Sequence, residues 1–350
     1  MIKGPITCAL LACAVVFAQR PSNPALLVPQ AAPELDYVAV PNPLPLPDGI
    51  KIGAPSAIRY DSQGHMFLLN RGPQALVEFD ENGKFLRIFA DGLLKRAHGL
   101  RIDDAGNLWV TDGLAHVVMK LNRQGEILLT LGTKGEAGKW DEATGSHRFN
   151  QPNDLAFGRN GDIFVVQGHT PEGDGGDPRV LKFDKNGKFI KTWGGRGSEP
   201  GQFTEAHGIA VDAQGLLWVT DRENQRIQIF DQDGTYIREL KYGGLPSSLI
   251  IGDRYIWVAN GFASQLLQLD LRGKFLAAIG KLGKGVGEFT EAHSVTVSPA
   301  GEIWVGDSVG NAVQKFVKKQ AGGYRRKTTA EKLLTHARIG ARMQSQRVRI

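Results

Sequence analysis

The stretch "HGIAVDAQGLLWVTDRENQRIQIFDQDGTYIREL", residues 207–240, decides the fold. It contains four short runs of alternating apolar and polar residues, which indicate four β-strands separated by polar turns. The Asp-Gly pair between the third and fourth runs is a strong hairpin signal, because its turn requires positive φ angles. The stretch therefore predicts one four-stranded antiparallel unit.

This unit recurs along the chain. Its first strand starts six times, with spacings of 40 to 55 residues, which is the period of a propeller blade. We therefore predict an all-β fold, a six-bladed β-propeller that spans residues 35–317. The six starting residues, called anchors below, are Ser56, His98, Asn153, His207, Ser247 and His293.

The sixth repeat ends at Val317 after three strands, which would leave an unpaired outer edge where the ring closes. The segment "DYVAV", residues 36–40, alternates apolar and polar residues and precedes the first repeat. We therefore expect this N-terminal strand to complete the last blade and close the ring.

The two ends of the chain differ from its body. Residues 1–18 contain a short apolar run that predicts a cleaved secretory signal and a secreted or periplasmic protein, with a lipid anchor at Cys13 as the alternative. The run is too short for a membrane span. Residues 19–34 are expected to form a linker. Both cysteines, Cys8 and Cys13, lie in the signal, so no disulfide framework is expected.

The net charge of +6 comes from the C-terminal tail, residues 318–350, which has ten Lys and Arg and one acidic residue, Glu331. We expect a solvated tail that is disordered or partly helical. Binding of nucleic acid or of an anionic surface by this tail is the alternative. For the propeller, we expect a monomer that binds no nucleic acid.

Histidine occupies the anchor in the second, fourth and sixth repeats: His98, His207 and His293. Alternate blades lie a third of a turn apart, and the first strand of a blade is the innermost, so three imidazoles should meet on the axis. Three neutral nitrogen donors suit a zinc ion with an open fourth position. The alternative is that each imidazole only hydrogen-bonds an adjacent blade.

The loops between second and third strands should open on the same face as the histidines. They contain Arg71, His169 and Arg222. Guanidinium groups bind carboxylates in a forked geometry, so a substrate that carries a carboxylate is expected here. An aspartate follows each anchor histidine by 14 residues, and we expect it to support the imidazole or the backbone: Asp112, Asp221 and Asp307.

The motifs "GQFTEAHGIAV", "VTDRENQRIQIF" and "GDSVGNAVQKF" resemble those of NHL-repeat propellers, and among them the peptidyl-α-hydroxyglycine α-amidating lyases. The resemblance runs from about residue 50 to 317. It implies zinc on the three anchor histidines and active-site arginines at Arg71 and Arg222. It also implies a calcium ion on the backbone oxygens of Ile58 and Leu100.

Three departures from this family affect the prediction. His169, in "VQGH", stands where the family has a catalytic tyrosine, and Ser294 stands where it has an acidic calcium ligand. The family's disulfides also have no cysteines here. His169 could act as the base near neutral pH, or it could be a fourth metal ligand.

The resemblance implies cleavage of a carbinolamide N–C bond, which releases a primary amide and glyoxylate. Zinc would polarise the substrate hydroxyl, a base would remove its proton, and arginine would hold the carboxylate. Two alternatives remain at this point: a non-catalytic propeller that binds a peptide or cell-envelope ligand, and a calcium-dependent lactone hydrolase.

Overall fold

The computed structural model describes residues 20–72, 74–169 and 176–319. Within them, 24 strands and one 3-10 helix, η1 (Pro24–Leu27), account for the regular structure. The predicted signal, residues 1–18, and nearly all of the predicted basic tail lie outside the described residues. No helix in the described ranges is long and apolar enough to span a membrane.

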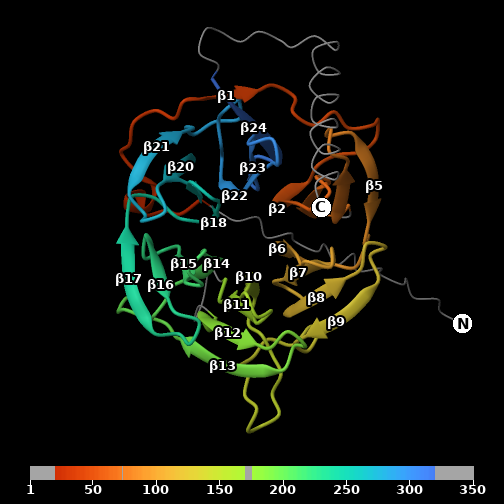
Figure 1. Ribbon diagram of the computed structural model, residues 1–350, viewed down its shortest axis with the longest axis vertical. Coiled ribbons are helices and arrows are strands. Elements are labelled where there is room, and N and C mark those ends of the chain that lie inside the picture. The colour runs from red at the N-terminus through yellow and green to blue at the C-terminus, as the bar shows by residue number, and fades with distance from the viewer. Residues whose placement is uncertain (1–19, 73, 170–175, 320–350) are drawn as a thin grey trace, which may run out of the picture.

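The strands form six four-stranded antiparallel sheets around a central axis, which confirms the predicted six-bladed propeller (Figure 1). The first blade consists of β2 (Ala54–Tyr60), β3 (Met66–Arg71), β4 (Leu76–Phe79) and β5 (Phe85–Phe89), and the second of β6 (Ala97–Ile102), β7 (Leu108–Asp112), β8 (Val117–Leu121) and β9 (Ile127–Leu131). The third blade consists of β10 (Pro152–Phe157), β11 (Ile163–Gln167), β12 (Arg179–Phe183) and β13 (Phe189–Gly194), and the fourth of β14 (Ala206–Val211), β15 (Leu217–Asp221), β16 (Arg226–Phe230) and β17 (Tyr236–Lys241). The fifth blade consists of β18 (Ser248–Ile251), β19 (Ile256–Asn260), β20 (Gln265–Leu269) and β21 (Phe275–Ile279), and the sixth of β22 (Ala292–Val297), β23 (Ile303–Asp307), β24 (Ala312–Lys318) and the N-terminal β1 (Tyr37–Val40).

The N-terminal strand closes the ring, as the truncated sixth repeat predicts. β1 pairs antiparallel with β24, with Val38 opposite Val317. The predicted linker, residues 19–34, also contacts the fifth blade, since the Pro33 carbonyl accepts a hydrogen bond from the backbone N–H of Ala278 at 2.8 Å. Leu35 is 2% exposed and joins the core between the fifth and sixth blades.

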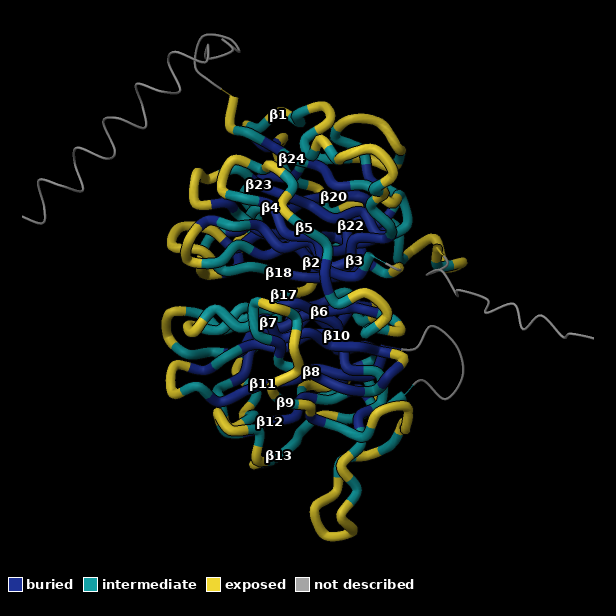
Figure 2. The backbone as a smooth tube through the Cα atoms, turned by 90° about the vertical axis from the view of Figure 1, so that its right-hand side faces the viewer, coloured by how far each residue is buried: buried dark blue, intermediate teal, exposed yellow. Residues whose placement is uncertain are grey.

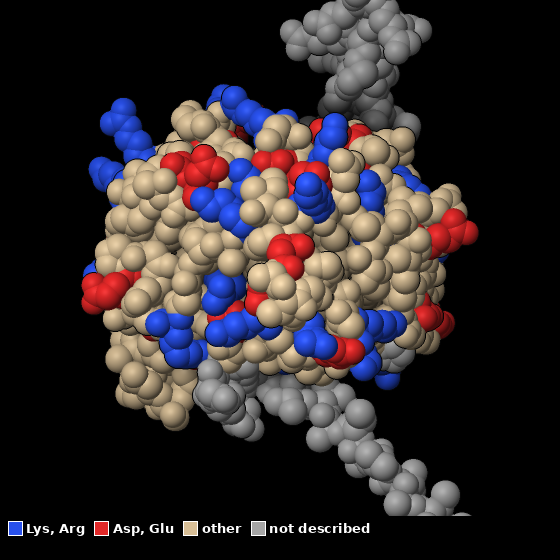
Figure 3. Space-filling view, turned by 90° about the horizontal axis from the view of Figure 1, so that it is seen from below, with Lys and Arg blue, Asp and Glu red and all other residues tan. Residues whose placement is uncertain are grey.

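Apolar side chains pack between neighbouring blades. Phe67 of the first blade and Val110 of the second belong to one buried cluster, and Val166 and Val219 join the third blade to the fourth in the same way. Burial increases from the exposed turns toward the axis (Figure 2). On the face drawn in Figure 3, basic and acidic side chains are interspersed. The fold thus holds the innermost strands rigidly at the axis.

Candidate metal centre and active site

Irregular pairing at the start of the innermost strands directs the anchor side chains. In β14, Ala206 pairs with Asp221 and Gly208 pairs with Thr220, so His207 lies in a β-bulge between them. The same shift in register surrounds His293 and His98. A bulge re-aims a side chain that regular pleating would place on one face of the sheet. The three anchor imidazoles therefore meet at the axis, with ring centroids 4.7 to 5.1 Å apart.

The next blade fixes the orientation of each of these imidazoles. Nδ1 of His98 lies 2.8 Å from the carbonyl oxygen of Asn153, and Nδ1 of His207 lies 2.6 Å from that of Ser247. Nδ1 of His293 lies 3.0 Å from the carbonyl oxygen of Ser56. A carbonyl oxygen only accepts, so Nδ1 carries the proton and Nε2 keeps its lone pair. The anchors of the odd blades thus hold the histidines of the even blades.

The imidazoles are neutral. Burial lowers the pKa of His98, His207 and His293 well below the ordinary value of 6.5, and neighbouring arginines and histidines lower the pKa further. Nε2 of His98 and Nε2 of His207 are buried and have no hydrogen-bond partner in the described structure. Buried nitrogen atoms without a partner are costly, so this site has unused ligand capacity.

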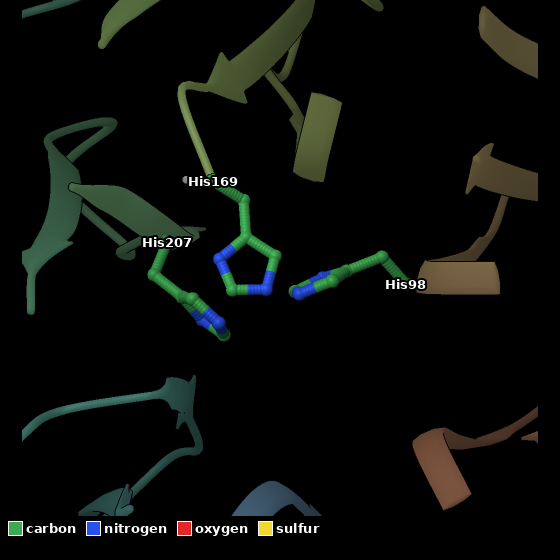
Figure 4. A group of neighbouring side chains, drawn as sticks. All are labelled: His98, His169 and His207. Carbon is green, nitrogen blue, oxygen red and sulfur yellow. The ribbon is translucent and has the colours of Figure 1, made fainter. Parts of the chain in front are cut away.

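His169 enters the same cluster from the loop after β11 (Figure 4). Gly168 precedes it with a φ of +106°, and a Cβ at this glycine would lie 2.5 Å from the Cα of Pro178, so only glycine fits. The ring centroid of His169 lies 4.9 Å from that of His98 and 5.3 Å from that of His207. Its Nδ1 hydrogen-bonds the carboxylate of Glu205.

The structure therefore offers a metal more donors than the predicted three. One ligand atom each from His98, His169 and His207 lie within 4.8 Å of one another. The predicted third ligand, His293, is next to this group, but its Nε2 lies 3.0 Å from Nη2 of Arg71. Three of these four histidines could hold a metal ion.

The residue two positions before each anchor histidine also faces the site. These residues are Arg96, Glu205 and Glu291. The aspartates that end the second strands fix their backbone: Asp221 accepts from the backbone of Glu205 at 3.3 Å, and Asp307 accepts from that of Glu291 at 2.9 Å. Asp112 accepts from the backbone of Arg96 at 3.0 Å. The predicted aspartates thus support the backbone before the histidine, and not the imidazole.

Sequence reasoning missed these three residues, although a signal was present. The segments "KRAH", "TEAH" and "TEAH" end at the three anchor histidines and place a charged residue at the same position each time. Two of these charged side chains are almost fully buried: Glu205 is 4% exposed and Glu291 is 0% exposed. Buried charges need partners, so these repeated positions indicate a site.

Arg222 forms ion pairs with two carboxylates of the chain. Its Nη2 donates to Oε1 of Glu291 at 2.8 Å, and its Nη1 lies 3.7 Å from Oε1 of Glu205. Burial alone would lower the pKa of Arg222, but the two glutamates raise it. The second oxygen of Glu291 accepts a hydrogen bond from the hydroxyl of Ser308. Arg222 thus lies at the site, but its charge is offset within the chain.

Arg71 has different surroundings. Its Nε donates to the Ala97 carbonyl at 3.3 Å, and its Nη2 contacts His293. Burial lowers the pKa of Arg71 to about 10, and the nearby Arg96 contributes to this shift. It remains charged at neutral pH.

Guanidinium groups occupy the carbonyl oxygens for which the resemblance implies calcium. The Ile58 carbonyl accepts from Arg59 at 2.6 Å, and the Leu100 carbonyl accepts from Arg101 at 2.9 Å. Nη2 of Arg101 also donates to Asp154 at 2.6 Å. A calcium ion here would lie against two like charges, so these guanidinium contacts would have to change before calcium could bind, and the calcium site stays a prediction.

A cavity of about 10 Å³ lies between these arginines and the histidines, on the axis. It has room for about one water molecule. The anchors and serine side chains such as Ser294 line it. The space on the axis beside the histidines is therefore too small for a substrate, which would have to approach the histidines from their other side.

Comparisons with known proteins agree with this fold. The family described as "NHL repeat" matches residues 203–230. Peptidyl-glycine alpha-amidating monooxygenase A of Xenopus laevis is 29% identical in an alignment 321 residues long, which covers 78% of this chain and 32% of that protein. The chain thus spans about a third of the length of this relative. A probable peptidyl-alpha-hydroxyglycine alpha-amidating lyase of Caenorhabditis elegans, pgal-1, is 35% identical over 151 residues, which are 42% of this chain and 40% of that protein.

Solved structures support the fold alone. A gluconolactonase from Xanthomonas campestris aligns with a TM-score of 0.58 at 16% identity, over 85% of this chain and 98% of its own. A streptogramin B lyase aligns with a TM-score of 0.52 at 17% identity, over 77% of this chain and 95% of its own. The chain is a six-bladed β-propeller that matches the NHL repeat at residues 203–230 and resembles the amidating lyases.

Proposed function

We propose that the chain is a zinc-dependent lyase that cleaves a peptidyl-α-hydroxyglycine to a primary amide and glyoxylate. The observation that carries this proposal is the cluster of four buried, neutral imidazoles at one end of the axis. The names of the relatives at 25 to 35% identity, which include an amidating lyase of Drosophila melanogaster, support the reaction type.

The zinc ligands in this proposal are Nε2 of His98, His207 and His293. These three histidines share the same support, because an Nδ1–H donated to the next blade leaves Nε2 with its lone pair. Such outer hydrogen bonds raise the basicity of a ligand and fix its orientation. When bound, the zinc would act as a Lewis acid on the substrate hydroxyl. Arg71 would release Nε2 of His293 and turn toward the substrate.

His169 is the base in this proposal. Its Nδ1–H donates to Glu205, so its Nε2 can accept the hydroxyl proton, and the carboxylate stabilises the imidazolium that forms. The electron pair of the O–H bond forms the carbonyl of glyoxylate, and the N–C bond breaks with its electron pair on the amide nitrogen. His169 then returns its proton to this nitrogen, and the primary amide leaves.

The two alternatives find less support. A lactone hydrolase that uses calcium needs carboxylate and carbonyl oxygens, but Asp154 and the carbonyls of Ile58 and Leu100 are bound to arginines. A purely binding propeller would not need four neutral imidazoles, two of which have a buried Nε2 without a hydrogen-bond partner among the described residues. Export of the chain by residues 1–18 is part of the proposal and is independent of the site.

Metal content tests the ligand assignment. We expect about one zinc per chain in the purified protein, loss of zinc in His98→Ala, His207→Ala and His293→Ala, and retention in His169→Ala. His147→Ala, at an exposed position, is the control. Zinc loss in His169→Ala together with full occupancy in His293→Ala would make His169 the third ligand and remove it as the base.

Glyoxylate release from a peptidyl-α-hydroxyglycine tests the reaction. The zinc-loaded wild type should release glyoxylate, and zinc-loaded His169→Ala should be slower by roughly 10²- to 10⁴-fold, the usual contribution of a positioned base. If the zinc-loaded wild type releases no glyoxylate from any such peptide, the proposed reaction is wrong.

A further inference from the structure

Three guanidinium groups lie around the histidine cluster, and they differ in what offsets their charge. Arg222 has two carboxylate partners, Glu205 and Glu291. Arg71 and Arg96 have no carboxylate within 4.0 Å among the described residues. Two cationic side chains beside the site therefore lack a direct carboxylate partner among the described residues, although Glu205 acts on both of them from a longer distance.

Arg96 is held in place from two sides. Its backbone N–H donates to Asp112 at 3.0 Å, and its Nη2 donates to the side chain of Gln151 at 3.3 Å. Gly113 lies against the guanidinium, and a Cβ there would come within 3.4 Å of Nε. This Nε is buried and has no hydrogen-bond partner in the described structure. A positioned guanidinium with an unused N–H is prepared for an acceptor from outside the chain.

The repeat places Arg96 at the same site as the two glutamates. Glu205 and Glu291 occupy the equivalent position in the fourth and sixth blades, and they contact His169 and Arg222. Electrostatic effects agree with this placement. Burial lowers the pKa of His169 most, and among the neighbouring charges Arg96 lowers it most. The second blade thus contributes a cation where the other two contribute anions.

We propose that Arg96, together with Arg71, binds the carboxylate of the substrate, and that Arg222 does not. Two guanidinium groups with open N–H donors suit a planar carboxylate, whereas Arg222 would have to leave two glutamates to do so. This assignment deepens the proposed function, on which its substrate class rests. It predicts that the enzyme requires a free C-terminal carboxylate and that Arg96 sets this requirement.

Binding of two stable ligands to the zinc-loaded protein tests the assignment without turnover. The probes are N-benzoylglycine and N-benzoylglycinamide, which differ only in the carboxylate, measured by isothermal titration calorimetry. The wild type should bind the carboxylate more tightly by about 10- to 100-fold, as expected for hydrogen bonds to a charged group. Arg96→Met should lose this preference, and Arg96→Lys should regain part of it, because lysine keeps the charge but not the fork.

Lys95→Met is the matched control, since it removes a neighbouring positive charge whose side chain is exposed. It should keep the wild-type preference. Equal losses in Lys95→Met and Arg96→Met would overturn the proposal, and so would a loss confined to Arg222→Met or a wild type without preference. Thermal melts identify any variant that fails to fold, in which case Arg96→Lys decides. A wild type that prefers the carboxylate but releases no glyoxylate would leave the carboxylate site standing and refute the lyase.

Discussion

The four neutral imidazoles at the axis predict a steep loss of stability in mild acid. Burial lowers the pKa of His98, His169, His207 and His293 well below 6.5 in the folded protein. In the unfolded chain these side chains take up protons near pH 6.5. Below this pH the unfolded state therefore binds more protons than the folded state, and the free energy of unfolding decreases as the pH is lowered. Above pH 7 both states are neutral, and the four groups have no effect on the pH dependence.

The magnitude follows from the number of groups. Each histidine that stays neutral lowers the free energy of unfolding by about 1.4 kcal/mol per pH unit below 6.5. Four such groups would together remove about 5 kcal/mol between pH 6.5 and 5.5, as an upper bound. This is comparable to the whole stability of many domains, about 5–15 kcal/mol.

The assay is urea unfolding of the metal-free protein at pH 7.5, 6.5 and 5.5. The His207→Gln variant should lose about a quarter of the pH dependence below 6.5, because glutamine cannot take up a proton. His147→Gln, which changes an exposed side chain, should keep all of it. A free energy of unfolding that is flat from pH 7.5 to 5.5, or an equal slope in wild type and His207→Gln, would refute the reasoning.

Three further predictions concern the scaffold. Deletion of residues 1–40 should lower the melting temperature by roughly 5–10 °C, because the edge of the last blade loses its partner, and a larger loss on deleting residues 320–350 would contradict this. In urea unfolding, Gly168→Ala should destabilise the protein by about 1–3 kcal/mol more than Gly145→Ala, because an added Cβ would clash with Pro178 at Gly168 and would meet nothing at Gly145. Equal effects of the two substitutions would contradict the close contact between Gly168 and Pro178. Added calcium should leave the melting temperature unchanged, and a rise in melting temperature with calcium would instead support the calcium site that the resemblance implies. Arg101→Met should destabilise the protein by about 3 kcal/mol, because it leaves the buried carboxylate of Asp154 without its cationic partner.

The sequence was sufficient for the fold because every blade carries its own local signals. The turn at Gly234 and its counterparts require positive φ angles, and the alternation of Ile227 and Ile229 with polar residues indicates a strand. The missing fourth strand of the last repeat was enough to predict that the N-terminal segment, β1, would complete it. These signals act over a few residues, so no knowledge of the ring was needed.

The polar partners at the site could not be predicted in the same way. Arg222 and Glu291 lie 69 residues apart and come from different blades. His169 meets Glu205 because Gly168 turns the chain at a positive φ, and no repeat position encodes this contact. Such pairs depend on the distance between blades across the axis, which follows from core packing and not from local pattern.

The pairing of β1 with β24 has a consequence for the order in which the chain can fold during its synthesis. Among the described strands, β1 leaves the ribosome first and its partner β24 leaves last, so β1 waits on the order of half a minute at ordinary elongation rates. His293, also made late, is seated by the carbonyl of Ser56 in the first blade. The last histidine therefore reaches its final orientation only when the ring has closed. A chain that stops before His293 would contain the first five blades but not the complete histidine cluster, so the full cluster requires the sixth blade as well.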